Sequence, residues 1–211
     1  MKMKKLFPFV NLVLFSVLLI SCSDFNVFKD VAFGSDMESV ENILAQKKIK
    51  YKSHLAAAQE FLDIDLENTE EIADAIANKH AGGLGEYLYK DYIYYLQKIC
   101  GMTFQSSILF FDGKCTNIKL EWHIKSNPSM RNSYLASEKL RAYIASCYPD
   151  KEFVPEEDEY NDEKFVMQVS DRVYITIKAD GENLRCDIED SYLQGPYREY
   201  KNKINDLVDY Y

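Results

Sequence analysis

The sequence lacks the short motifs that identify many reaction centres. It contains no H-E-x-x-H, G-x-S-x-G, phosphate-loop or EF-hand spacing, and each of those chemistries needs its groups at that spacing. Histidine is scarce, and His54, His80 and His123 are far apart in the chain. A cysteine–histidine pair for nucleophilic catalysis is formally possible, but unrelated surface histidines are the expectation. The sequence therefore does not predict an enzyme.

Clustered metal ligands are also missing. No two cysteines have the C-x-x-C spacing of zinc and redox sites. The acidic run from Glu156 to Glu163 lacks the alternating ligands and the central glycine of a calcium loop. A solvated acidic loop is the expectation there. Neither a metal nor another cofactor is predicted.

Positive charge is in short supply. The chain has 25 basic and 34 acidic residues, a net charge of −9. The first 21 residues hold three lysines and no acid, so the remaining 190 residues carry 22 basic and 34 acidic residues, a net charge of −12. This charge repels nucleic acid and anionic lipid headgroups, so no nucleic-acid partner is predicted. The hydrophobic share of 47% is typical of a globular protein.

No hydrophobic run is long enough for a typical membrane span. Leu6–Ile20 is the apolar segment, and it is interrupted by Pro8, Asn11 and Ser16. A spanning helix needs about 20 apolar residues. Three lysines precede the segment, and this order is typical of a secretory signal peptide. Residues 1–21 are therefore expected to be a signal that is removed, in preference to a permanent transmembrane anchor.

The end of this segment resembles the lipobox of bacterial lipoproteins. Leu19-Ile20-Ser21 places a branched residue and a small residue before Cys22, as that family does. The resemblance implies cleavage before Cys22, a diacylglyceryl group on its thiol and acylation of the new N-terminus, including palmitate-type chains. Each buried methylene contributes about 0.8 kcal/mol to membrane binding, so the membrane is the expected partner of Cys22. An ordinary signal peptide with a chance cysteine is the alternative.

The residues after Cys22 bear on location. Aspartate at the next position retains some lipoproteins at the inner membrane, and this chain has Ser23 there. The resemblance thus implies an outer-membrane protein of the bacterial envelope. Ser23-Asp24-Phe25 is similar to short acidic tags that direct some lipoproteins to the cell surface. Whether the domain faces the periplasm or the exterior stays open.

Four cysteines remain once Cys22 carries lipid. An even number in an oxidising envelope allows two disulfides with three connectivities. Small buried hydrophobic residues with free thiols are an equal alternative. The four are Cys100, Cys115, Cys147 and Cys186.

Capping signals predict where helices begin after a tether at residues 22–30. The first helix is expected at a capping box made by Ser35 and Glu38. Its apolar residues follow at helical spacing to about Lys47. The other helices are expected to begin at Ser53, at Asn68 or Thr69, at Asn127-Pro128 and at Pro196.

Alternating hydrophobicity predicts two sets of three strands. The clearest is the third, in which Ile118, Leu120 and Trp122 share one face. Asp112-Gly113 and Asp180-Gly181 are hairpin signals, because type I′ turns need positive φ. The strands are expected at 87–99, 103–111, 118–124, 165–169, 173–177 and 184–188.

The order of a helix and then a three-stranded antiparallel meander occurs twice. It predicts one α+β domain at 31–211 with helices on one sheet face, formed by two repeats at 31–126 and 127–211. This order is similar, in architecture alone, to that of SmpA/OmlA envelope lipoproteins and of tandem-repeat protein inhibitors of β-lactamase. No functional residue of either family is matched here.

If helices cover the apolar face, the opposite face carries a mixed polar and aromatic set. A protein or carbohydrate partner could bind such a surface, although many antiparallel sheets simply have one solvated face. Five tyrosines lie between residues 87 and 95. They are consistent with either interpretation, because tyrosine is common both on contact surfaces and in half-buried strands. The expected binding residues are Glu121, His123, Tyr174, Thr176, Arg185 and Asp187.

These observations favour a non-catalytic binding or interaction module held at the bacterial envelope. A structural or assembly factor of the outer membrane is the second interpretation. An envelope hydrolase is the third.

Overall fold

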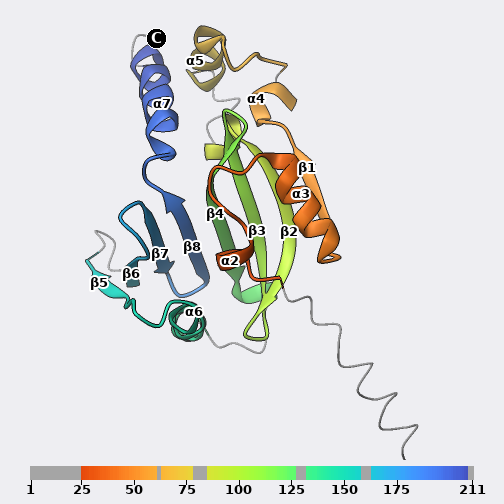
Figure 1. Cartoon of the computed structure of the whole chain (residues 1–211). Coiled ribbons are helices and arrows are strands. Elements are labelled where there is room, and N and C mark those ends of the chain that lie inside the picture. Colours follow the sequence, from red (N-terminus) through yellow and green to blue (C-terminus); the bar gives the residue numbers. More distant parts are fainter. Residues whose placement is uncertain (1–24, 61–62, 78–84, 127–131, 158–162, 209–211) are drawn as a thin grey trace, which may run out of the picture.

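The computed structural model describes residues 25–60, 63–77, 85–126, 132–157 and 163–208. These residues form an α+β fold around one eight-stranded antiparallel sheet of order β1-β2-β3-β4-β8-β7-β6-β5 (Figure 1). The expected α+β class with an antiparallel sheet is confirmed. The strands are β1 Tyr51–His54, β2 Asp91–Ile99, β3 Met102–Phe111, β4 Lys114–His123, β5 Val154–Glu156, β6 Glu163–Gln168, β7 Val173–Ala179 and β8 Asn183–Asp190.

Helices lie against one face of the sheet and beyond one end of it. Figure 1 shows α2 and α3 in front of the strands, α6 end-on beside the lower ends of β7 and β8, and α5 and α7 at the end of the molecule that holds the C-terminus. The helices are α2 Val27–Asp30, α3 Met37–Gln46, α4 Ala57–Glu60, α5 Thr69–Ala77, α6 Ser133–Cys147 and α7 Gln194–Val208, with the short 3₁₀ segments η1 Gly85–Leu88 and η2 Ile124–Ser126.

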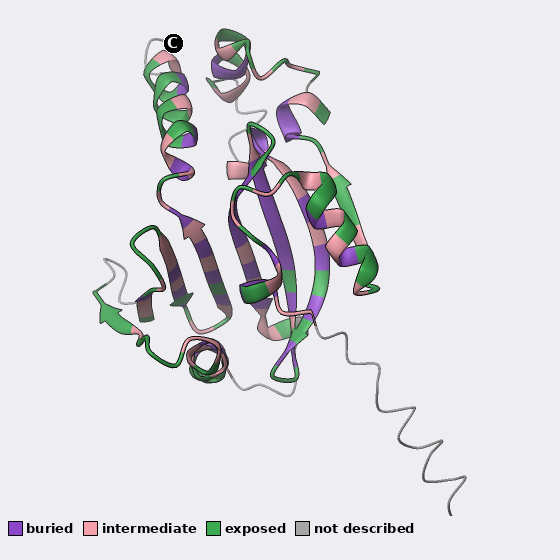
Figure 2. Cartoon of the chain, viewed as in Figure 1, coloured by how far each residue is buried: buried purple, intermediate pink, exposed green. Residues whose placement is uncertain are grey.

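The main core lies between the sheet and the helices α2, α3 and α6. Alternation in β4 turns Ile118, Leu120 and Trp122 to this side, and each is at most 2% exposed. Leu44 of α3 and Leu140 of α6 belong to the same cluster. Burial is concentrated in the central strands (Figure 2). A fully buried leucine side chain stabilises the fold by about 2 kcal/mol, so this layer holds the sheet.

A second, smaller core lies beyond the strand ends. Ile72 of α5 and Ile204 of α7 are at most 1% exposed and cluster with Tyr89 and Tyr197. The Tyr200 hydroxyl donates a hydrogen bond of 2.6 Å to the Leu66 carbonyl. The helices α5 and α7 therefore depart from the expected single layer on one sheet face.

The first helix begins one residue later than the capping box predicts. Asp36, and not Ser35, is the N-cap of α3, and its carboxylate accepts a 2.7 Å hydrogen bond from the Ser39 N–H. Ser53 does not cap a helix either. It lies in the edge strand β1, and its hydroxyl is hydrogen-bonded to the Glu41 carboxylate. A partner in the tertiary fold competes here with the local cap.

Helix α5 begins at Thr69, as expected, but two later helix starts differ from expectation. Asn132 caps α6 by accepting a 3.0 Å hydrogen bond from the Leu135 N–H. The expected start at Asn127-Pro128 lies outside the described residues. Helix α7 begins at Gln194, two residues before Pro196.

The strand expected at residues 87–99 begins only at Asp91. The four residues of η1 turn the chain before it. The Asp91 carboxylate accepts a 2.8 Å hydrogen bond from the Ala56 N–H, which ties the strand start to the segment after β1. Hydrophobic and polar residues alternate irregularly at 87–90 because the chain forms a 3₁₀ turn there and not a strand.

The described part of the expected tether packs on the domain. Val27 is 1% exposed and Phe28 is 8% exposed, both in the main core. Asn26 caps the short helix α2 by accepting a 3.0 Å hydrogen bond from the Phe28 N–H. The expected signal peptide and Cys22 lie outside the described residues.

The expectations about a membrane span and about the cysteines can be compared with the described residues. Among them, no helix is both long enough and apolar enough to cross a bilayer. The cysteines at positions 100, 115, 147 and 186 are free thiols. Of the two alternatives for these cysteines, the structure has the free thiols.

Candidate functional site

The sheet has an open face opposite α3 and α6. Residues directly opposed on antiparallel strands point to the same side, and Glu121 is opposed to Arg185 while Asp187 is opposed to Thr176. Alternation along the strands adds the remaining members. All six residues expected from the sequence therefore lie on the open face: Glu121, His123, Tyr174, Thr176, Arg185 and Asp187.

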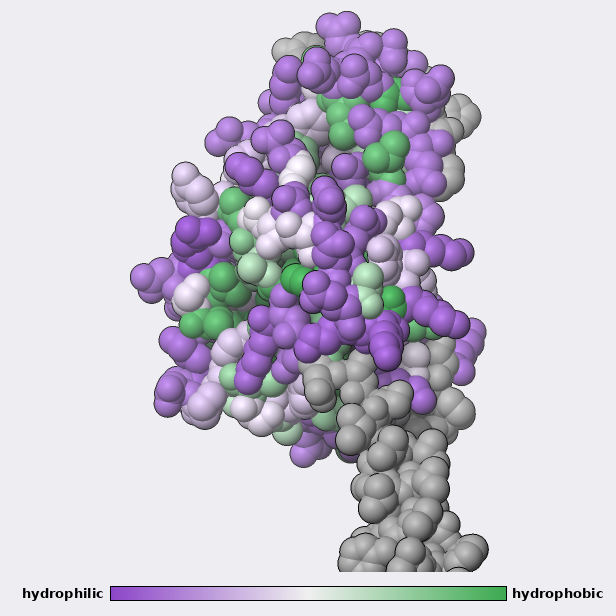
Figure 3. Space-filling model, turned by 45° about the vertical axis from the view of Figure 1, so that its right-hand side comes forward, coloured by the Kyte–Doolittle hydropathy of each residue, from purple (hydrophilic) through white to green (hydrophobic). Residues whose placement is uncertain are grey.

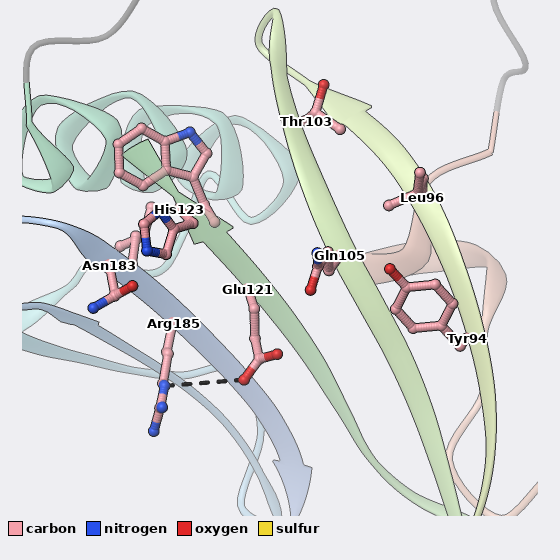
Figure 4. A pocket seen from close by; sticks show the side chains of 10 residues that line it. Tyr94, Leu96, Thr103, Gln105, Glu121, His123, Asn183 and Arg185 are labelled. Carbon is pink, nitrogen blue, oxygen red and sulfur yellow. Dashed lines mark ion pairs between the residues drawn. The ribbon is translucent and has the colours of Figure 1, made fainter. Parts of the chain in front are cut away.

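A groove of about 400 Å³ crosses the open face near one end of β2, β3, β4 and β8. Figure 4 shows its side chains, with Tyr94 and Leu96 on one side and Arg185 and Asn183 on the other. Its size is that of a small-ligand site. We call it the open-face groove. It is lined by Tyr94, Leu96, Thr103, Gln105, Glu121, Trp122, His123, Asn183, Leu184 and Arg185.

An ion pair crosses the groove floor between β4 and β8. The Arg185 Nε and Glu121 Oε1 atoms are 3.9 Å apart, and the two side chains are 70% and 44% exposed. Such a solvated pair contributes about 0–1 kcal/mol to stability. Both groups therefore keep most of their hydrogen-bonding capacity for a ligand.

His123 stands beside this pair at the end of β4. Its Nδ1 accepts a 3.1 Å hydrogen bond from the Lys125 N–H, so the neutral ring carries its proton on Nε2. Directly opposite, Asn183 accepts and donates through its amide and is held by the Asp180 carboxylate at 3.0 Å. This end of the groove is thus polar and fixed by local turns.

Asp187 belongs to a different part of the open face. Its carboxylate is 3.8 Å from the Lys119 Nζ, which is also 3.3 Å from Glu86. Burial raises the pKa of Asp187, and Lys119 opposes that rise. The charge of Asp187 is therefore engaged within the protein, and it does not line the groove.

Tyr174 and Thr176 lie on β7, one strand beyond the groove. The Tyr174 hydroxyl accepts a 3.3 Å hydrogen bond from the Gln168 amide of the neighbouring strand. Neither residue lines the groove. The structure therefore brings together three of the six expected residues in this hollow, namely Glu121, His123 and Arg185.

The tyrosines near β2 divide among four environments. Tyr95 is 1% exposed in the main core, and Tyr89 lies in the smaller core. Tyr92 stacks on the His54 ring with centroids 4.8 Å apart, and the Tyr87 ring packs edge-on against the Tyr92 ring. Tyr94 lines the groove. A crowded tyrosine run thus does not form a single contact surface.

A buried lysine joins the open face to α7. Lys90 is 0% exposed, and its ammonium donates hydrogen bonds of 2.9 Å to the Asn117 side chain and 3.1 Å to the Gln194 side chain. It also lies 3.8 Å from the Tyr197 ring centroid. Burial disfavours the charged form and lowers the pKa of Lys90 to about 8, although nearby Glu86 opposes the shift.

The lining of the groove suits recognition of a polar molecule. It combines two amides, a carboxylate, a guanidinium, an imidazole and a threonine hydroxyl with Tyr94 and the exposed Leu96. It contains no serine or cysteine beside His123. Within the part of the chain that the structure describes, no group of three or more histidine, cysteine, aspartate or glutamate residues could hold a metal ion.

Several important residues were not found from the sequence. Tyr94, Leu96 and Gln105 point to the open face because β2 and β3 alternate, but the misplaced start of β2 hid that alternation. Lys90 lies within the strand expected at residues 87–99, and nothing in the sequence indicates that its side chain is buried. Only its contacts in three dimensions with Asn117 identify it.

Comparison with protein-family models, with curated proteins and with solved structures finds no match for this chain. The groove and the charges around it are therefore the basis for a functional proposal.

Proposed function

We propose that this protein is a lipid-anchored binding module of the bacterial cell envelope, with the open-face groove as its ligand site. The observation that carries the proposal is the groove of about 400 Å³, into which Glu121, Arg185, His123 and Gln105 bring polar groups beside exposed Leu96. A carbohydrate or an extended peptide fits this chemistry, because both present alternating polar groups and apolar surfaces.

The proposal is for binding without catalysis. Nucleophilic catalysis needs a nucleophile within hydrogen-bond reach of its base. The groove lining offers neither serine nor cysteine to His123, and Figure 4 shows the Thr103 hydroxyl directed away from the imidazole. The Glu121–Arg185 pair is largely exposed to solvent, whereas the groups that transfer protons in enzymes are usually desolvated. Both observations favour recognition over reaction.

The proposed location of the protein is the outer membrane, to which a lipid at Cys22 would anchor it. Its support is the lipobox-like Leu19-Ile20-Ser21-Cys22 after a short apolar segment. An anchored module acts on ligands that reach the membrane surface. This restricts the ligand to molecules of the envelope or its immediate surroundings.

We also infer that the domain arose from two helix-plus-meander units. In support, α3 precedes β2-β3-β4 and α6 precedes β6-β7-β8, and the sheet order is symmetrical about the β4–β8 pair. The edge strands β1 and β5 follow α3 and α6 in the same places. The groove then straddles the junction between the units.

The binding site can be tested by cross-linking in living cells. A photoreactive benzoyl-phenylalanine in place of Gln105 would project from the groove floor, and the same residue in place of Tyr192 serves as the control, since Tyr192 is 72% exposed and outside the groove. A defined adduct from position 105 alone is expected. Mass spectrometry of the adduct identifies the ligand.

Arginine variants make this test specific. Arg185→Ala should lower the yield of the adduct at least fivefold, because a ligand loses a charged hydrogen bond. Arg198→Ala is the matched control and should leave the yield unchanged. Arg198 is an exposed arginine of α7, and its Nη2 lies 3.4 Å from the Glu189 carboxylate of β8. No adduct from position 105, or equal losses in both variants, would contradict the groove as the site.

The same experiment separates the other interpretations. A stoichiometric adduct with one outer-membrane protein would favour an assembly factor. A reduced adduct in Tyr174→Ala, outside the groove on β7, would mean that the whole open face is used. Release of a cleaved product by the purified protein would favour a hydrolase.

A further inference from the structure

Lysines gather at the sheet edge where β1 begins. Residues 42–59 contain four lysines and no acidic residue, although residues 22–211 carry a net charge of −12. Strand β2, which pairs with β1, contributes a fifth lysine beyond their paired segment. We call this set the lysine edge: Lys47, Lys48, Lys50, Lys52 and Lys98.

Apolar side chains lie among these cations. An open hollow of about 550 Å³ is lined by Lys48–Lys52 and Tyr94–Leu96. Four of the lysines are exposed, and Leu96 is 56% exposed beside them. Figure 3 turns this side of the molecule forward and shows hydrophilic side chains with smaller hydrophobic groups between them. Cations around an accessible apolar side chain suit the boundary between lipid headgroups and acyl chains.

The start of the described chain lies at the same edge. The Phe25 ring packs edge-on against Tyr95 with centroids 5.7 Å apart, and Tyr95 is opposed to Tyr51 of β1. Cys22 precedes Phe25 by three residues. Because three residues span at most about 11 Å, a lipid attached at Cys22 enters the bilayer close to this edge.

We propose that the lysine edge docks on an anionic bilayer surface and sets the orientation of the anchored domain. The inference rests on the proposed lipid anchor at Cys22. The net negative charge of the domain does not prevent this contact, because charges more than about 8 Å away are largely screened at physiological salt. At the point of contact five lysines outnumber Glu41, whose carboxylate is hydrogen-bonded to Ser53 of β1, so the local charge is positive.

A different role for these lysines is protection of a sheet edge. Charged residues on edge strands prevent pairing between molecules, and Lys52 lies in β1. However, Lys47 and Lys48 lie between α3 and β1, and Lys98 lies on β2. Reversal of charge separates the two roles, since glutamate also blocks edge pairing but is repelled by anionic lipid.

Docking in this way has a consequence for the ligand site. Tyr94 and Leu96 line both the hollow at the lysine edge and the open-face groove. The groove therefore opens next to the membrane. A ligand at the bilayer surface would reach it without dissociating from the membrane.

The test is lysine footprinting of the full mature protein in vesicles. The protein is reconstituted into phosphatidylcholine vesicles and into vesicles of three parts phosphatidylcholine to one part phosphatidylglycerol, and exposed amines are acetylated. Labelling of Lys48, Lys50, Lys52 and Lys98, followed by mass spectrometry, should be at least threefold slower on the anionic vesicles. Lys201 and Lys203, exposed on α7, should be labelled equally on both.

Charge reversal supplies the matched comparison. Each lysine at an anionic surface strengthens binding roughly fivefold, so Lys48→Glu with Lys50→Glu should abolish the protection of Lys52 and Lys98. The control Lys201→Glu with Lys203→Glu should retain it. Raising the salt to 0.5 M should also remove the protection, as expected for screened charges.

The outcomes distinguish this inference from the proposed anchor. Intact mass reports whether Cys22 carries lipid. A lipidated protein with equal labelling on both vesicles would overturn the docking inference alone. A mature chain without lipid at Cys22 would overturn the anchor and the inference together. Loss of protection in the α7 control as in the edge variant would also overturn the inference.

Discussion

At the scale of single residues, the buried Lys90 carries a charge that only its contacts with α7 and the sheet make tolerable. Lys90 sits without solvent exposure among Asn117, Gln194 and the Tyr197 ring. Burying an ammonium is costly unless it is hydrogen-bonded and paired, and here two side-chain oxygens and Glu86 at 3.8 Å offset that cost. Lys90 therefore joins α7 to the sheet and has no opening toward a substrate.

The lowered pKa of Lys90 predicts a dependence of stability on pH. The unfolded chain keeps this proton up to about pH 10, whereas the folded chain releases it near pH 8. Between these values the unfolded state binds more protons, so the contribution of Lys90 to the free energy of unfolding rises with pH.

A comparison with Lys90→Met isolates this effect. The free energy of unfolding of the wild type, relative to that of the variant, should rise by about 1–2 kcal/mol from pH 7 to pH 9.5. Urea denaturation at several pH values measures it. The buried Cys115, whose pKa is raised to about 12 by burial, keeps its proton in both folded proteins up to pH 9.5 and so does not contribute to the difference. A constant difference between the two proteins would contradict the prediction.

At the scale of elements, turns with positive φ determine the pairing of the central strands. Asp112 and Gly113 have φ values of 51° and 67°, as the Asp-Gly signal predicts. The β2–β3 turn has the same geometry at Cys100 and Gly101, with φ values of 52° and 76°. Cysteine is not a usual residue for such a turn, so its sequence signal is weaker.

Replacement of Gly113 should weaken the β3–β4 hairpin. A Cβ there would meet no atom within 4 Å, so the cost of Gly113→Ala is conformational and amounts to about 1 kcal/mol. The control is Gly195→Ala in α7, where a Cβ also meets nothing and alanine favours the helix. Chemical denaturation should show a loss of stability for the first variant and none for the second. An equal loss in both would argue against a conformational cost.

At the scale of the whole molecule, one sheet separates three surfaces. Its helical face holds the core, its open face holds the groove, and its β1 edge holds the lysines. The groove and the lysine edge share Tyr94 and Leu96, so the proposed ligand site and the proposed membrane contact are neighbours. Changes at one surface are expected to alter the other.

The proposed lipid anchor predicts a specific change in the mature protein. Cys22→Ser removes the thiol, so intact mass should show neither lipid nor cleavage before residue 22, and the uncleaved chain should be absent from the outer-membrane fraction. Cys100→Ser, at an exposed free thiol, is the control and should leave both unchanged. Membrane retention of Cys22→Ser with an unaltered mass of the mature protein would contradict the anchor.

Part of the candidate site could be predicted from alternation alone. Glu121, His123 and Arg185 follow from the period of β4 and β8, because alternate residues of a strand share a face. Tyr94, Gln105 and Asn183 required the actual strand boundaries and the neighbours of each strand. The burial of Lys90 depends on Gln194, which is 104 residues away in the chain, and no local pattern carries that information.

The sequence by itself determined the α+β class, the six residues of the open face and the Asp112-Gly113 turn, because these depend on hydrophobic period and on local backbone preference. Tertiary structure alone decided that three of the six residues meet in a groove and that Lys98 of β2 lies beside the lysines at and before β1. It also decided that Asp36 and Asn132 cap their helices. These features arise from contacts between distant segments, whose free energy exceeds the small local propensities that a sequence displays.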